Sequence, residues 1–327
     1  MIDLLNQLKA LADPSRIRIL MILSDEPLHV NELLDVLSMG QSRVSRHLRI
    51  LADAGLLVWR RDGSRIYYSI DSNFQKQLLW STVSDLNAIW GDELATTMKA
   101  DQLRLASILE SRRARSLVHF EDFGASQDED QREYVDSLYY RNQVISILPK
   151  QRGYILEPGC GAGALSAMLA EKAERLILVD QSRTMLRLAA AKANNSEKID
   201  LRVGYIEHLP LADDEVDTVV LSMVLHHSAE PAQALKEAWR VLKPSGQLIV
   251  AELNHHSEEV MRRQFEDFWL GFDSDMLKQE IVEAGFQGIE VYSGKGEGRL
   301  SCLFFTAKKP KAKKVFSSRK SLMSSTV

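Results

Sequence analysis

From residue 154 onward the chain alternates short β-rich runs with helical segments, and this pattern restricts the fold more than any other feature of the sequence. The β-rich runs are residues 154–157, 176–180, 201–203, 218–221 and 248–251. Strands that alternate with helices usually form a parallel sheet, because each helix carries the chain back to the edge where the next strand begins. The pattern therefore predicts an α/β domain with a parallel sheet.

The turn after the first run is rich in glycine and reads Glu-Pro-Gly-Cys-Gly-Ala-Gly over residues 157–163. Glycines let the backbone approach a ligand closely at the start of a helix. The stretch from Gly159 also satisfies the relaxed dinucleotide fingerprint, and Asp180 ends the second run where a ribose-binding acid is expected, so a nicotinamide enzyme is one interpretation. Glu157 precedes the first glycine by two residues, where a carboxylate repels a pyrophosphate but suits a cationic amino acid. This favours S-adenosylmethionine (SAM) over a nicotinamide cofactor.

The same half of the chain resembles the class I SAM-dependent methyltransferases. The resemblance rests on residues 155–163, 179–186 and 240–246, and it spans roughly residues 135–307. It implies a Rossmann-like sheet that ends in a hairpin. We expect Asp273 to cap a helix that runs to Ala284, with strands over residues 286–292 and 300–307 as the closing hairpin.

The resemblance also implies how the cofactor is held. Glu157 and the backbone of the glycine loop would hold the methionine part, Asp180 would bind both ribose hydroxyls, and Gln181 and Met185 would flank the adenine. The family usually has Gly-Asp after the third strand, but this chain has Gly204-Tyr205-Ile206-Glu207, so adenine recognition there would rest on the backbone. The expected cofactor-binding residues are Glu157, Gly159, Gly161, Gly163, Asp180, Gln181, Met185, Gly204, Tyr205, Ile206 and Ser222.

Two histidine pairs follow the fourth and fifth runs: His226 with His227, and His255 with His256. Adjacent strand ends meet at the cleft edge of such a sheet, so we expect the four imidazoles to converge. Methyl transfer needs an aligned nucleophile, and a base only where the acceptor must lose a proton. His226 and His227 are the candidate catalytic residues.

Two other interpretations of the histidines stay open. One is a metal site completed by Glu252, which we do not expect because sequence-adjacent histidines often point in different directions. The other is a structural role as helix caps or polar groups in the cleft wall. The segment Trp269-Leu270-Gly271-Phe272 fits an acceptor-pocket wall and a core position equally well.

The first quarter of the chain has the spacing of a helix-turn-helix. Apolar residues recur at helical intervals over residues 3–23 and 30–37, and residues 41–54 place Val44, Leu48 and Leu51 on one face. Residues 56–61 and 65–70 flank Asp62-Gly63-Ser64, a hairpin turn signal that predicts a wing. Residues 40–65 hold six arginines and two aspartates, a local charge of +4 that suits contact with phosphate.

Roughly residues 1–75 resemble the ArsR/SmtB winged-helix repressors, which implies DNA binding. The resemblance rests on residues 12–16, 41–48 and 54–56, and it implies a dimerisation helix within residues 74–116. Soft-metal sensing is not expected, because residues 28–33 lack the paired cysteines of the metal sensors. The expected DNA-binding residues are Gln41, Ser42, Arg43, Ser45, Arg46, His47, Arg60, Arg61 and Arg65.

Composition limits the remaining classes of function. The 327 residues carry a formal net charge of −4, and residues 308–327 hold seven Lys/Arg and no acid. The rest of the chain is therefore more acidic than the total indicates, so any DNA contact needs a local basic patch. The two cysteines, Cys160 and Cys302, lie far apart and provide neither a disulfide framework nor a thiolate zinc site. No apolar run approaches the roughly 20 residues of a membrane span, and the start does not resemble a secretory signal, so we expect a cytoplasmic protein.

These observations divide the chain into four parts: a winged helix (1–75), a helical dimerisation or linker segment (76–133), a methyltransferase domain (134–307) and a basic disordered tail (308–327). We predict a homodimeric transcriptional regulator that binds a double-stranded DNA operator and methylates a small organic molecule. Base methylation is not expected, because the sequence has no Asp/Asn-Pro-Pro-aromatic segment and neither cysteine follows a proline. One alternative is a non-catalytic repressor that senses SAM or S-adenosylhomocysteine (SAH), and another is a winged helix that serves only dimerisation.

Overall fold

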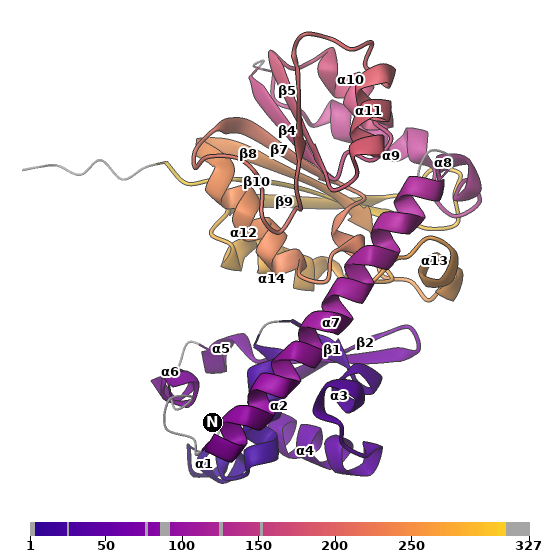
Figure 1. Cartoon of the computed structure of the whole chain (residues 1–327). Helices are drawn as coiled ribbons and strands as arrows, with labels where there is room; N and C mark the ends of the chain where they lie inside the picture. Colours follow the sequence, from indigo (N-terminus) through magenta and orange to yellow (C-terminus); the bar gives the residue numbers. More distant parts are fainter. Residues whose placement is uncertain are drawn as a thin grey trace, which may run out of the picture.

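The computed structural model describes residues 4–24, 26–75, 78–85, 92–123, 127–150 and 153–311. It contains two sheets, each with its own hydrophobic core, and a long helix that runs from one unit to the other (Figure 1). Within the described residues, no helix combines the length and the apolar character that crossing a bilayer requires.

The smaller unit is a winged helix, as predicted. Four helices, α1 (Leu4–Leu11), α2 (Pro14–Leu23), α3 (Val30–Leu37) and α4 (Gln41–Asp53), pack on a three-stranded sheet in the order β1-β3-β2. The strands are β1 (Leu28–His29), β2 (Leu57–Asp62) and β3 (Arg65–Ile70). Asp13 begins α2 by accepting hydrogen bonds from the amides of Ser15 and Arg16. We call β2, β3 and the turn between them the wing.

Helix α7 (Asp92–Phe123) joins the two units. Shorter helices α5 (Ser72–Gln75), α6 (Leu78–Asp85) and α8 (Gln127–Asp130) lie on either side of it in sequence. Asp101 of α7 accepts two hydrogen bonds from the Arg18 guanidinium of α2, at 2.6 and 2.8 Å, which fixes the start of α7 on the winged helix. Part of the segment expected to hold the dimerisation helix, including Leu86 and Ile89, lies outside the described residues.

The larger unit contains a seven-stranded sheet in the order β6-β5-β4-β7-β8-β10-β9. The five strands from β6 to β8 are parallel, and β10 is antiparallel to both of its neighbours, so the expected parallel sheet and closing hairpin are both confirmed. The strands are β4 (Tyr154–Pro158), β5 (Arg175–Asp180), β6 (Ile199–Val203), β7 (Val216–Ser222), β8 (Leu242–Leu253), β9 (Gln287–Gly294) and β10 (Cys302–Lys308).

Helices cover both faces of this sheet (Figure 1). Alternate residues of one strand enter different cores: Ile155 packs with α9 (Ser137–Ser146), α10 (Ala164–Ala170) and α11 (Arg183–Lys192), whereas Leu156 packs with α12 (Pro231–Val241) and α14 (Ser274–Glu283). The short elements η2 (Leu225–His227) and α13 (Glu259–Gln264) follow the ends of β7 and β8. Because both faces are filled, a ligand site is left at the carboxyl ends of the parallel strands.

The sheet continues further toward the end of the chain than the sequence analysis expected. Lys308 is the last residue of β10, and Lys309 is buried with its Nζ 2.6 Å from Asp214 Oδ1 and 4.0 Å from the Trp239 ring centre. The predicted start of the disordered tail at residue 308 is therefore too early, because Lys309 has an acidic and an aromatic partner inside the fold. Residues 312–327 of the predicted tail lie outside the described residues.

Candidate functional site

A cavity of about 900 Å³ lies at the carboxyl ends of β4, β5 and β7, and its far wall comes from the winged helix and α7. The structure brings the candidate cofactor residues from four separate loops to this one cavity. Its lining includes Glu157, Gly159, Gly161, Gly163, Asp180, Gln181, Met185, Gly204, Tyr205, Ile206 and Ser222, and also His226 and His227.

The glycine loop leaves room for a ligand because its backbone turns tightly. Gly159, Gly161 and Gly163 all have positive φ, at 68°, 50° and 78°. A side chain on Gly159 would overlap Val224, and one on Gly163 would overlap the backbone of Ala189 in α11. Within the described residues, a side chain on Gly161 would meet no atom within 4 Å. The first and third glycines therefore serve packing, while the second faces open space.

Two buried carboxylates stand on either side of this loop. The Glu157 side chain accepts a hydrogen bond from Ser166 Oγ at 2.5 Å, and burial raises the pKa of Glu157 to about 8, although Ser166 and Arg141 act against that rise. Asp180 accepts one hydrogen bond per oxygen, from the amides of Gly161 and Ser182, at 2.9 and 2.8 Å. Burial also raises the pKa of Asp180, while these amides oppose the shift. Each Asp180 oxygen keeps a lone pair for a ligand hydroxyl.

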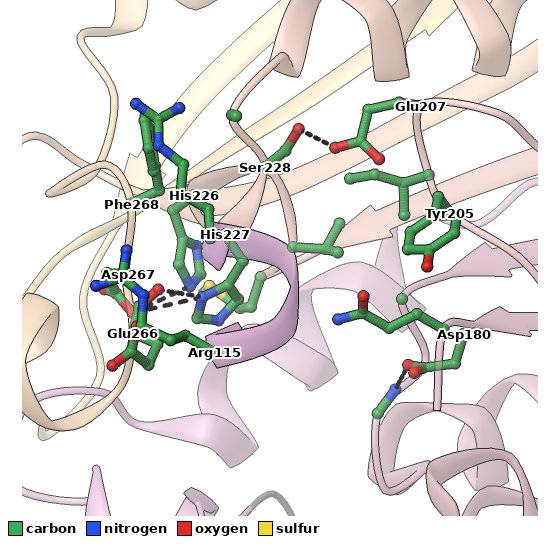
Figure 2. A pocket seen from close by; sticks show the side chains of 18 of the residues that line it. Arg115, Asp180, Tyr205, Glu207, His226, His227, Ser228, Glu266, Asp267 and Phe268 are labelled. Carbon is green, nitrogen blue, oxygen red and sulfur yellow. Dashed lines mark hydrogen bonds and ion pairs between the residues drawn. The ribbon is translucent and has the colours of Figure 1, made fainter. Parts of the chain in front are cut away.

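The cavity has two ends (Figure 2). Asp180 and Tyr205 lie at one end, and His226, His227 and Asp267 lie at the other. Tyr205 is about half exposed, and Glu207 near it accepts a hydrogen bond from Ser228 Oγ at 2.5 Å. The methyltransferase pattern usually has an aspartate just after β6, and the chain lacks it. Glu207 does not take its place in this hydrogen-bond network, because it is directed to Ser228.

His226 is held by a buried glutamate. Its Nδ1 lies 2.6 Å from Glu252 Oε2, while Glu252 Oε1 accepts hydrogen bonds from the amides of Val224 and Leu225. Burial by itself lowers the pKa of His226, but the carboxylates of Glu252 and Asp267 outweigh it and raise this pKa to about 9. The geometry fixes the ring so that Nε2 points away from Glu252.

Asp267 is a site residue that sequence analysis did not find. Its Oδ1 lies 3.8 Å from His226 Nε2 and 3.8 Å from His227 Nδ1, and the side chain is fully buried. Neither of its oxygens has a hydrogen-bond partner within the part of the chain that the structure describes. Burial raises the pKa of Asp267 to about 7. No sequence signal marks this residue, because it lies in an irregular segment after α13.

The second histidine pair does not join the first, so the predicted convergence of four imidazoles is wrong. His255 is exposed, and neither it nor His256 is among the described residues that line the cavity. His256 Nδ1 instead accepts a hydrogen bond from the amide of Glu258, which turns this ring toward its own loop.

The wing packs against residues 259–272 of the larger unit. The Arg60 guanidinium lies over the Trp269 ring at 4.4 Å and donates to the carbonyl of Gly271 at 3.0 Å. Tyr67 packs on the rings of Trp269 and Phe268 at 4.7 and 5.2 Å. Trp269 and Phe272 are thus core residues, and Phe268 is the aromatic residue of this segment that lines the cavity.

An ion pair between residues 200 positions apart reinforces this interface. Arg262 donates to Asp62 Oδ2, and the fully buried Asp62 also accepts from the amide of Leu270 at 3.1 Å. At the tip of the wing, the amide of Ser64 donates to Glu259 Oε1 at 2.8 Å. The wing is therefore docked on the larger unit through both charge and aromatic stacking.

Because of this docking, the expected DNA-binding residues of α4 and those of the wing have different surroundings. Gln41, Ser42, Arg43, Ser45 and Arg46 are exposed on α4, which lies at the end of the molecule far from the seven-stranded sheet (Figure 1). His47 is buried instead, because it falls on the same helical stripe as Val44 and Leu51. Arg61 and Arg65 are exposed, but Arg65 lines the cavity, and Arg60 is stacked on Trp269 and so does not face DNA in this arrangement.

Comparison with known proteins finds two domains in the chain. Residues 13–57 match a family model described as bacterial regulatory protein, arsR family, and residues 156–250 match one described as methyltransferase domain. The chain thus joins an arsR-family helix-turn-helix domain to a methyltransferase domain, as its resemblances implied.

Curated relatives and a solved structure match parts of the chain. An uncharacterized 37.1 kDa protein of transposon TN4556 from Streptomyces fradiae is 36% identical over 35% of this chain and 34% of its own length. The ubiquinone/menaquinone biosynthesis C-methyltransferase UbiE of Rubrivivax gelatinosus is 32% identical over 37% of this chain and 47% of its own length. The chain therefore spans about a third to a half of the length of these relatives.

Among solved structures, the N-methyltransferase NodS of Bradyrhizobium japonicum in complex with SAH has the same fold as the larger unit. The match has a TM-score of 0.50 and 19% identity, and it covers 60% of this chain and 99% of NodS.

Proposed function

We propose that this chain transfers a methyl group from SAM to a small organic acceptor, and that its winged helix binds double-stranded DNA. The observation that carries the first part is that all the candidate cofactor residues line a single cavity in a methyltransferase domain. Glu157 lies beside the glycine loop at the place for the cationic methionine part of SAM, and the free lone pairs of Asp180 suit the two ribose hydroxyls.

The acceptor occupies the opposite end of the cavity, against the histidine pair and Phe268. We assign His226 and His227 to contact with the acceptor atom that takes the methyl group, because they line the cavity just after the end of β7, whereas the other described histidine of the lining, His29, belongs to the winged helix. Alignment of that atom with the sulfonium carbon supplies much of the catalysis. The enclosure of this end by the winged helix and α7 favours an acceptor of small-molecule size.

Calorimetry with SAM and SAH on the full chain tests the cofactor assignment. We expect both to bind, and Asp180→Asn to weaken both by about 10-fold to 100-fold, because it removes a charged acceptor of two hydrogen bonds. Exposed Asp213→Asn is the matched control and should bind as the unmodified chain does. Labelled methyl transfer from SAM to a small-molecule extract fraction then tests turnover. A chain that ignores both nucleosides would contradict the proposal.

A second candidate function is a non-catalytic repressor that senses SAM or SAH. It is favoured by the docked wing, because residues 259–272 hold the wing on one side and contribute Asp267 and Phe268 to the cavity on the other. A ligand that moves this segment would change the freedom of the wing, and with it the affinity for DNA. Duplex binding measured with and without SAM or SAH separates the two functions: ligand-dependent affinity without turnover supports the sensor alone.

We further propose that the protein is a homodimer. Leu4, Leu5 and Leu8 of α1 are each about half exposed, which is unusual for three neighbouring leucines of a short helix. A second copy that covers α1 would bury them and would place two α4 helices on one duplex, as operators with paired half-sites require.

A further inference from the structure

We infer that His226, His227 and Asp267 form a binding site for a divalent transition-metal ion of the Zn²⁺ type at the acceptor end of the cavity. Each of these residues offers one ligand atom, a ring nitrogen or a carboxylate oxygen, and the three atoms all lie within 4.8 Å of one another. Two imidazoles and one carboxylate form a ligand set that such ions accept. No family model or relative described above assigns a metal to these residues.

The distances suit a tetrahedral ion after a small adjustment. Both histidine nitrogens lie 3.8 Å from Asp267 Oδ1. Ligand bonds of about 2.0–2.2 Å separate tetrahedral ligand atoms by roughly 3.4 Å, so each histidine nitrogen needs to approach Asp267 Oδ1 by only a few tenths of an ångström. The two imidazoles, whose ligand atoms lie within 4.8 Å of each other, would also move closer together, and the ion would replace the contact of His227 Nδ1 with the Glu266 carbonyl at 3.4 Å. Because all three residues line the cavity, the positions that the protein leaves open face the acceptor.

The surroundings of Asp267 are the second, independent observation. A buried carboxylate oxygen normally accepts hydrogen bonds, yet neither oxygen of Asp267 does so within the described chain, although the side chain is fully buried. The imidazoles of His226 and His227 lie 3.8 Å from Asp267 Oδ1, beyond hydrogen-bond distance. Arg262 is engaged by Asp62 and Glu259. A bound dication would give this carboxylate the direct ligand contact that it lacks.

Glu252 completes the arrangement as a positioning residue. Its Oε2 lies 2.6 Å from His226 Nδ1, so when an ion displaces the proton of Nε2 the remaining proton of His226 belongs on Nδ1, and Nε2 lies on the side of Asp267. Metal-bound histidines usually donate their other ring N–H to a carboxylate in this way. Both amides held by Glu252 follow the end of β7, which fixes the histidine pair relative to the sheet.

An ion at this site would coordinate a hydroxyl or enol oxygen of the acceptor and ease the loss of its proton. This role rests on the proposed methyl transfer, but the binding of the ion does not. His226 and His227 would then act as ligands and not as free bases.

Metal binding is tested on the full chain after chelation and dialysis. We expect about one Zn²⁺ per chain by elemental analysis after gel filtration, and a Co²⁺ spectrum typical of tetrahedral sites. Asp267→Asn and His227→Gln should abolish stoichiometric binding, and Glu252→Gln should weaken it by about 10-fold to 100-fold. His255→Gln changes an exposed histidine outside the cavity and should bind as the unmodified chain does.

Thermal melting shows whether a variant that fails to bind metal is still folded. In chelator, Asp267→Asn should still melt in one cooperative transition, because Asn keeps the size of the side chain and removes only its buried charge. Zn²⁺ should raise the melting temperature of the unmodified chain and of His255→Gln, but not that of Asp267→Asn. Substoichiometric Zn²⁺ in the unmodified chain, or a Co²⁺ spectrum that survives Asp267→Asn, overturns the site. SAM calorimetry on the same samples distinguishes the metal site from the proposed methyl transfer. If the chain binds SAM but no metal, only the metal site is rejected.

Discussion

The affinity for SAM should depend on pH through Glu157. This carboxyl has a pKa of about 8 in the ligand-free cavity because it is buried, yet it must be ionised to pair with the cationic end of SAM. Below its pKa, part of the binding free energy is therefore spent on removing a proton. Ionisation costs about a factor of 10 in affinity at pH 7 and about a factor of 100 at pH 6, and almost nothing at pH 9.

The amino group of SAM itself titrates near pH 8, so it lowers the affinity on the alkaline side. Glu157→Gln isolates the contribution of the protein, because the ligand titrates equally in both proteins. We expect the SAM affinity of the unmodified chain, divided by that of Glu157→Gln, to rise about 100-fold from pH 6 to pH 9. Calorimetry in two buffers should show that the unmodified chain releases nearly one proton when it binds SAM at pH 7. Exposed Glu171→Gln is the control. Equal pH profiles for Glu157→Gln and the unmodified chain would refute the reasoning.

The same pKa shift has a consequence for the ligand-free protein. A carboxyl whose pKa is raised by folding stabilises the fold at low pH, and this stabilisation is lost as the pH rises toward the folded-state value of about 8. Glu157→Gln is therefore expected to melt higher than the unmodified chain at pH 8 when no ligand is present.

Three other substitutions test the packing. Gly163→Ala should lower stability by about 1–3 kcal/mol by thermal melting, because it combines a positive φ with overlap against α11, and an unchanged melting temperature would contradict this close approach. Arg262→Met should cost about 3–5 kcal/mol by leaving Asp62 buried without its nearest cation, and adding Asp62→Asn should recover most of the loss; if the double variant is no more stable than the single one, the ion pair is not the cause. Leu5→Arg should convert the dimer to a monomer in analytical ultracentrifugation, whereas Leu138→Arg, on α9 and also exposed, should not; a dimer that survives Leu5→Arg places the interface elsewhere.

The cofactor end of the cavity could be predicted from sequence because its features are local. Glu157 and Asp180 lie at the carboxyl ends of β4 and β5, and the glycine loop follows β4. The parallel topology brings successive strand ends to one edge whatever the details of packing. His47 was also predictable in principle. It lies three residues after the buried Val44 and four before the buried Leu51, so helical spacing places it on the buried stripe despite its polar ring.

The acceptor end could not be predicted in the same way. Asp267 lies in an irregular segment whose path depends on contacts with the wing, which is about 200 residues away in sequence. Arg60 shows the same limit: an arginine in a wing strand suits a phosphate contact, and only the three-dimensional arrangement reveals Trp269 under its guanidinium. Contacts between the two units thus decide both the composition of this end and the orientation of the wing.

These contacts lead to a last prediction about the relation between DNA and cofactor. Residues 259–272 pack on the wing through Arg262 and Trp269, and they line the cavity through Asp267 and Phe268. Arg112 of α7 also lies over Phe268 at 4.6 Å, so helix, wing and cavity meet at one segment. If binding at the cavity alters the docking of the wing, linkage requires that DNA alter the affinity for SAM by the same factor.

This equality can be measured on the full chain with a short duplex. The ratio of duplex affinities with and without SAM should equal the ratio of SAM affinities with and without duplex, at one salt concentration because phosphate contacts are salt-dependent. Arg262→Met should bring both ratios toward one, because it releases the wing from the segment that senses the ligand. A coupling factor that stays unchanged in Arg262→Met would show that the signal does not pass through the docked wing, even if both ligands bind.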